Sequence, residues 1–96
     1  MGAEVFYTEA KGATAQEAFK HAVDAALWDY GHAGYSGTIA EKGSFVEIAL
    51  PEGKDAEQYA YELIDVGDER IDDKWGPAGC IHLGGDRWAF FGWASS

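Results

Sequence analysis

The sequence is short of cysteine and of positive charge, and each shortage excludes a class of protein. Its single cysteine, Cys80, excludes the internal disulfide framework that stabilises many small secreted domains. The sequence also lacks a basic N-terminus followed by an apolar run, and no stretch approaches the roughly 20 apolar residues that span a bilayer. These absences predict a cytoplasmic protein with no secretion signal and no membrane partner.

Positive charge is scarce, because seven lysine and arginine residues stand against 17 aspartate and glutamate residues, for a formal net charge of −10. Phosphate backbones and anionic lipids repel such a molecule, so we expect no direct contact with nucleic acid. A basic protein is the partner that this charge favours. The alternative is that the acidic excess only keeps the protein soluble.

Apolar residues occur in the proportion of a folded domain, at 47% hydrophobic and 15% aromatic. A chain of 96 residues can build one core but not a core and a separate catalytic subdomain. We therefore expect a single domain over residues 1–96.

The order of the patterned segments predicts an α+β fold with two helices. Thr14 and Glu17 have the spacing of a capping box, and Asp55 and Gln58 repeat this spacing at the second helix. The expected elements are a strand at 3–10, a helix at 14–30, a hairpin of strands at 35–41 and 44–50, a helix from 55, a loop at 67–77, and a hairpin of strands at 79–83 and 87–94. The order β-α-β-β-α-β with a further C-terminal hairpin strand matches the ferredoxin-like split βαβ arrangement, an antiparallel sheet with two helices on one face.

The final strand carries large aromatic residues on both of its faces. Because side chains alternate along a strand, Trp88 and Phe90 face one side while Phe91 and Trp93 face the other. If both helices cover one face, the other face is bare, and we expect Phe91 and Trp93 to contact a partner there. A loop, the 67–77 segment or a second copy of the protein in a homodimer could cover the same face instead.

Trp28 is a second exposed aromatic candidate. On a helical wheel it lies opposite the apolar stripe, beside Glu17, His21 and Asp24. Tryptophan often anchors interfaces because it buries a large area at a small entropic cost. The alternative is that Trp28 packs flat against the edge of the core.

Acidic residues concentrate between residues 52 and 73, where nine carboxylates stand against Lys54 and Arg70 only. Asp55, Glu62, Asp65 and Glu69 would share one helical face if the helix continued through Gly67, forming a ladder that imitates spaced phosphates. The alternative is an ordinary solvated helix face. The acidic residues that we expect to contact a partner are Asp55, Glu62, Asp65, Asp68, Glu69, Asp72 and Asp73.

The sequence contains no recognisable catalytic constellation, so we expect no enzyme, no cofactor and no metal site. Cys80 and His82 share a strand face, but a zinc site would need two further ligands. A small-molecule site is the alternative to a protein-binding surface. Tyr35, Lys42 and Arg87 would bind a nucleotide or a similar anion in such a site.

The stretches GYSGTIAEKGSF and DKWGPAGCIHL, with WAFFGWAS, resemble those of small uncharacterised proteins of bacterial viruses and their hosts. The resemblance covers most of residues 34–94 and brings no activity with it. Together with the charge, it suggests a viral-type inhibitor that blocks a basic surface of a host defence protein, such as a nuclease or a CRISPR complex. A nucleotide-binding module and a structural homodimer remain the alternatives.

Overall fold

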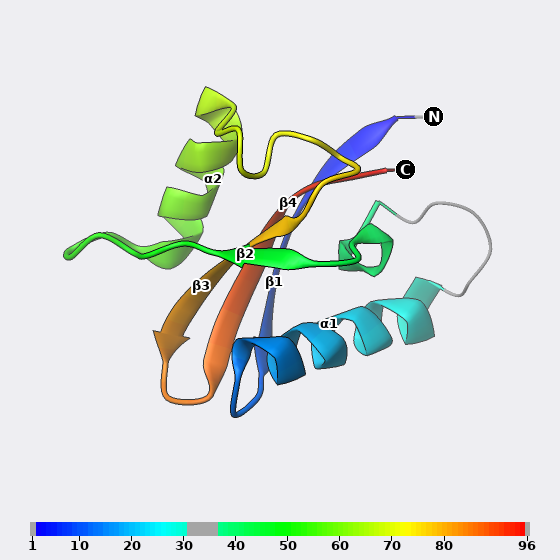
Figure 1. Ribbon diagram of the computed structural model, residues 1–96, viewed down its shortest axis with the longest axis horizontal. Coiled ribbons are helices and arrows are strands. Elements are labelled where there is room, and N and C mark those ends of the chain that lie inside the picture. Colours follow the sequence, from blue (N-terminus) through cyan, green and yellow to red (C-terminus); the bar gives the residue numbers. More distant parts are fainter. Residues whose placement is uncertain (1, 31–36, 96) are drawn as a thin grey trace.

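The computed structural model describes residues 2–30 and 37–95, which form an α+β fold with a four-stranded mixed sheet and two helices (Figure 1). Its elements are β1 (Ala3–Lys11), α1 (Ala15–Tyr30), a 3₁₀ turn η1 (Ile39–Glu41), β2 (Phe45–Glu47), α2 (Ala56–Val66), β3 (Ala78–Gly84) and β4 (Arg87–Ser95).

The sheet has the strand order β1-β4-β3-β2, with β4 antiparallel to both of its neighbours and β2 parallel to β3. The expected antiparallel sheet of ferredoxin-like order is therefore wrong. The predicted C-terminal hairpin is present as β3 and β4. The predicted hairpin before α2 begins outside the described residues at 35–36, and residues 37–50 form no hairpin. In its place, Thr38 caps η1 by accepting a hydrogen bond from the Ala40 N–H, and the buried Ile39 packs into the core.

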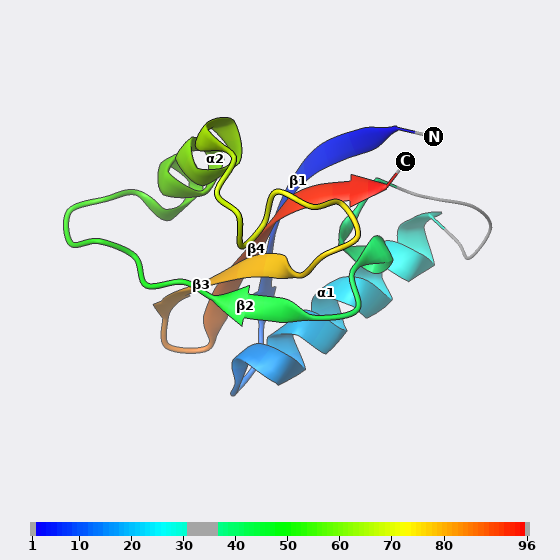
Figure 2. The same ribbon diagram turned by 45° about the horizontal axis from the view of Figure 1, so that its top comes forward.

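The two helices lie on opposite faces of the sheet, which Figure 1 shows almost edge-on and Figure 2 shows turned. Trp88 and Phe90 of β4 pack in one buried cluster with the apolar stripe of α1. Phe91 and the half-buried Trp93 pack in a second cluster with α2. The expectation of two helices on one face is wrong, and the bare aromatic face that it implied does not exist.

Local sequence explains where both helices begin. The Thr14 hydroxyl accepts a hydrogen bond from the Glu17 N–H at 3.2 Å, and the Glu17 carboxylate accepts one from the Ala13 N–H at 3.3 Å. At α2, the Asp55 carboxylate accepts a hydrogen bond from the Gln58 N–H at 3.0 Å. Both capping predictions are thus confirmed. Of the described helices, neither is long and apolar enough to cross a membrane.

Candidate functional site

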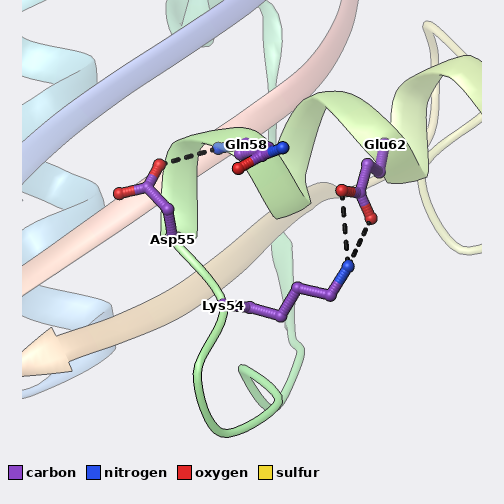
Figure 3. Close-up of polar contacts among 4 residues, drawn as sticks. All are labelled: Lys54, Asp55, Gln58 and Glu62. Atoms are coloured by element: carbon purple, nitrogen blue, oxygen red, sulfur yellow. Dashed lines mark hydrogen bonds and ion pairs between the residues drawn. The ribbon is translucent and has the colours of Figure 1, made fainter.

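The acidic segment, residues 52–73, forms the turn before α2, α2 itself and the start of the loop to β3. Two of its carboxylates are ion-paired within the segment. Lys54 Nζ lies 3.0 Å from Oε1 and 3.4 Å from Oε2 of Glu62, across the first turns of α2 (Figure 3). Asp55 has a different structural role, because its side chain caps the helix.

Asp68 and Arg70 form the second ion pair, immediately after α2. Arg70 Nε donates to Oδ1 and Arg70 Nη2 to Oδ2 of Asp68, both at 2.9 Å, and the Arg70 N–H adds a third bond of 3.0 Å to Oδ1. The hydrogen bonds from Arg70 lower the pKa of Asp68 to about 2. The pair lies at the turn that follows α2, where the Ile71 N–H also donates to the Asp68 carbonyl at 3.0 Å.

The helix ends at Val66, so the predicted carboxylate ladder is wrong. Gly67 caps the end in the left-handed conformation, with φ of 69°, and its N–H bonds back to the carbonyls of Leu63 and Ile64. Glu69 therefore lies in the loop and not on the same helical face as Asp65. The ladder depends on a helix that continues through Gly67, and Gly67 instead ends it, in agreement with the loop expected at 67–77.

The other carboxylates of the segment form no ion pair among the described residues. The Asp73 side chain accepts a hydrogen bond from the Trp75 N–H at 2.8 Å and so shapes the loop. Five carboxylates are left with neither an ion pair nor a capping role in the described chain, and all are exposed: Glu52, Glu57, Asp65, Glu69 and Asp72.

The aromatic candidates are distributed differently from the prediction. Phe91 is 0% exposed and Trp93 is half-buried beneath α2, so Phe91 offers no surface to a partner in this fold. Trp28 is 89% exposed, as its helical position predicts, but it lies on α1, across the sheet from the acidic segment. The structure does not join Trp28 and the acidic segment into one surface.

Trp75 is the exposed aromatic residue that sequence reasoning missed. It lies two residues beyond the acidic segment, is 62% exposed, and has Lys74 Nζ 5.3 Å from its ring centroid. Val66, at the end of α2, is 77% exposed. The signal was present in the sequence, because a tryptophan between Asp-Asp-Lys and Gly-Pro stands in a polar loop and not in a core pattern.

The three residues of the small-molecule alternative do not come together. Lys42 is only 4% exposed, and its Nζ donates to the carbonyls of Asp73, Lys74 and Gly76 at 3.3, 3.2 and 3.0 Å. Burial lowers the pKa of Lys42, an effect that Asp73 opposes. Arg87 lines a different hollow and pairs with Glu9 at 2.7 Å, while Tyr35 falls outside the described residues.

Cys80 is buried, and this burial raises the pKa of its thiol to about 12. A thiol of this kind stays protonated at neutral pH and is a poor nucleophile and a poor metal ligand. Within residues 2–30 and 37–95, no group of three or more metal-ligating side chains gathers at one place.

Comparison with known proteins adds no family to this geometry. The chain matches no protein-family model, no curated protein and no solved structure.

Proposed function

We propose that this protein is a non-enzymatic binding protein that blocks a basic surface of a nucleic-acid-handling protein, in the manner of a viral inhibitor of a host defence nuclease. The observation that carries the proposal is the set of exposed carboxylates without an ion pair on α2 and in the loop that follows it, a loop that also carries the exposed Trp75. We use the name acidic surface for these carboxylates together with Trp75 and Val66, that is, for Glu57, Asp65, Val66, Glu69, Asp72 and Trp75.

The charges of the acidic surface contribute little to the fold. Asp55, Glu62 and Asp68 cap or pair locally, whereas Asp65 and Glu69 touch no cation among the described residues. Like charges held close together repel each other and reduce the stability of a compact chain. A basic partner would turn that repulsion into attraction and would speed association by steering.

Trp75 and Val66 supply exposed apolar area that a partner could bury. Buried aromatic residues at the centre of an interface contribute most of its affinity, while charges at the rim set the orientation and the rate. The acidic surface combines one exposed ring, one exposed aliphatic side chain and exposed carboxylates on α2 and the loop that follows it in the chain. Proteins that bind the phosphate backbone carry lysine- and arginine-rich surfaces, and the acidic surface is complementary in charge to such surfaces.

Charge reversal on the acidic surface tests the proposal. Purified nucleases of bacterial defence, including guide-RNA-loaded complexes, are assayed for DNA binding and cleavage with the protein at equimolar concentration. We expect inhibition of at least one nuclease, weakened about tenfold or more by the double substitution Asp65→Lys with Glu69→Lys, because like charges across an interface cost several kcal/mol. Trp75→Ala should weaken it to a similar degree.

The matched control is Asp86→Lys with Glu47→Lys, which makes the same change in net charge at exposed positions outside the acidic surface. This control should keep the inhibition of the unmodified protein within about twofold. The proposal fails if the unmodified protein inhibits none of the nucleases, or if the control pair loses inhibition as fully as the test pair.

A further inference from the structure

Within the part of the chain that the structure describes, β1 is an edge strand of the sheet. It pairs with β4 on one side, and no described strand lies on the other. In an antiparallel ladder, each residue directs both its N–H and its C=O either toward its partner strand or away from it. Gly12 N–H bonds to Asp86 O at 2.8 Å, whereas Lys11 O accepts a hydrogen bond from His21 Nδ1 at 2.7 Å on the opposite side. The residues of β1 that face away from β4 are therefore Ala3, Val5, Tyr7, Glu9 and Lys11.

A groove of about 860 Å³ runs along this edge. Its floor is formed by residues 4–11 of β1, one wall by α1 and the other by Tyr61 of α2. The wall from α1 presents Ala22, Ala25 and Ala26, whose small side chains leave room above the strand. His21 closes the groove at the Lys11 end through its bond to the Lys11 carbonyl.

The edge lacks most of the features that normally prevent strand addition, although it carries the charged side chains of Glu4, Glu9 and Lys11. Natural edge strands are short, bulged, interrupted by proline or studded with inward-pointing lysine. The opposite edge, β2, is protected because it has only three residues. β1 has nine residues, no proline, an uninterrupted register with β4, and a lysine only at its end.

We infer that β1 binds an extended, lysine- or arginine-bearing segment of the partner, which adds to the sheet as a fifth strand. This inference deepens the proposed function and rests on it for the basic character of the partner. Glu4, Asp29 and Lys11 line the groove without an ion-pair partner among the described residues, while Glu9 is already paired with Arg87, so carboxylates outnumber the one lysine in this lining. A second copy of this chain would instead bring together two molecules of net charge −10.

Amide hydrogen exchange followed by NMR tests strand addition directly. The probe is a capped nonapeptide of alternating lysine and valine, and the control peptide has glutamate in place of lysine. We expect the lysine peptide to slow exchange at Val5, Tyr7 and Glu9 about tenfold or more, because those N–H groups gain acceptors. Exchange at Thr8, whose N–H faces β4, should not change. The inference is overturned if the outward amides are unaffected, or if the glutamate peptide protects them equally.

Two variants locate the binding at the edge. Val5→Pro removes one outward N–H at a position where an edge strand tolerates proline, and Val5→Thr is its matched control. Ala25→Phe fills the groove from α1 and leaves β1 intact. We expect Val5→Pro and Ala25→Phe each to weaken the lysine peptide about tenfold, and Val5→Thr to stay within about twofold.

The remaining outcomes separate this inference from its rival and from the proposed function. Protection of the outward amides that rises with protein concentration in the absence of peptide, with dimers in sedimentation that Val5→Pro abolishes, would overturn it in favour of a second copy. Inhibition of a nuclease that survives both Val5→Pro and Ala25→Phe would overturn strand addition alone. Peptide binding at β1 without inhibition of any nuclease would overturn the proposed function and leave β1 as a site for a basic strand.

Discussion

At the scale of single residues, Gly79 shows how closely β3 and β4 pack. It pairs with Phe91 across the sheet, and a Cβ atom at this position would lie 2.5 Å from Cζ of that fully buried ring. We expect Gly79→Ala to lower the free energy of unfolding by about 1–3 kcal/mol, because the ring has no space to move into. Urea denaturation measures the change. Gly43→Ala, where nothing lies within 4 Å of an added Cβ, should be close to neutral, and equal losses at both positions would contradict this account.

Asp68 makes a pH-dependent contribution to stability. Its pKa in the folded protein, about 2, lies below the ordinary value of 3.8, so its contribution is complete above pH 4 and disappears as the pH falls toward 2. We expect Asp68→Asn to cost about 1 kcal/mol or less at neutral pH, because the pair is at the surface, and to cost nothing near pH 2. Urea denaturation at several pH values measures this difference. A penalty that stays constant down to pH 2 would contradict it, and Glu69→Gln serves as the unpaired control.

At the scale of elements, Lys42 holds the loop between α2 and β3 in place. Its ammonium group donates to the carbonyls of Asp73, Lys74 and Gly76 in that loop, which also carries Asp72 and Trp75. We expect Lys42→Met to lower the free energy of unfolding by about 2–3 kcal/mol, because three part-buried carbonyls lose a charged donor. Denaturation measures the loss, and faster amide exchange in residues 73–76 would locate it. Lys20→Met, at an exposed ion pair, is the control, and a loss no larger than that of the control would contradict this role.

Local patterns predicted the elements well but not how they assemble. Capping residues located the starts of both helices, and the Gly-Gly-Asp turn located the final hairpin, because these signals act within a few residues. The pairing of β2 with β3 joins segments separated by a helix, and no local pattern specifies it. From the sequence, the segment of β2 therefore predicts half of a hairpin, and the resulting order of elements predicts both helices on one face of the sheet.

For the candidate site, too, the sequence predicts the local features but not how they come together in space. The concentration of carboxylates is a property of the sequence and needs no structure to find. The structure is needed to tell which carboxylates have no ion-pair partner. Lys54 pairs with Glu62 and Arg70 pairs with Asp68, and both pairs depend on the geometry of the turns at the two ends of α2. Trp28 is separated from the acidic segment because α1 and α2 lie on opposite faces of the sheet. The alternation of aromatic side chains along β4 is compatible with this placement but does not specify it.

At the scale of the whole molecule, the sheet is covered on both sides by the chain's own helices (Figure 2). The aromatic residues of β4 are thus explained by two cores and not by a partner. Contacts with other molecules are left to the outer surfaces of the helices, the loops and the edge of β1. The acidic surface and the β1 groove belong to these parts of the molecule.

The position of β4 also has a consequence for synthesis. This strand joins β1 to β3 and contributes rings to both cores, yet it is formed by residues 87–95. While the ribosome is still adding residue 80, β1 has no neighbour and both helices lack the surface that they cover. Folding of this protein during translation therefore has to wait for its central strand, and until then the nascent chain exposes apolar side chains to chaperones.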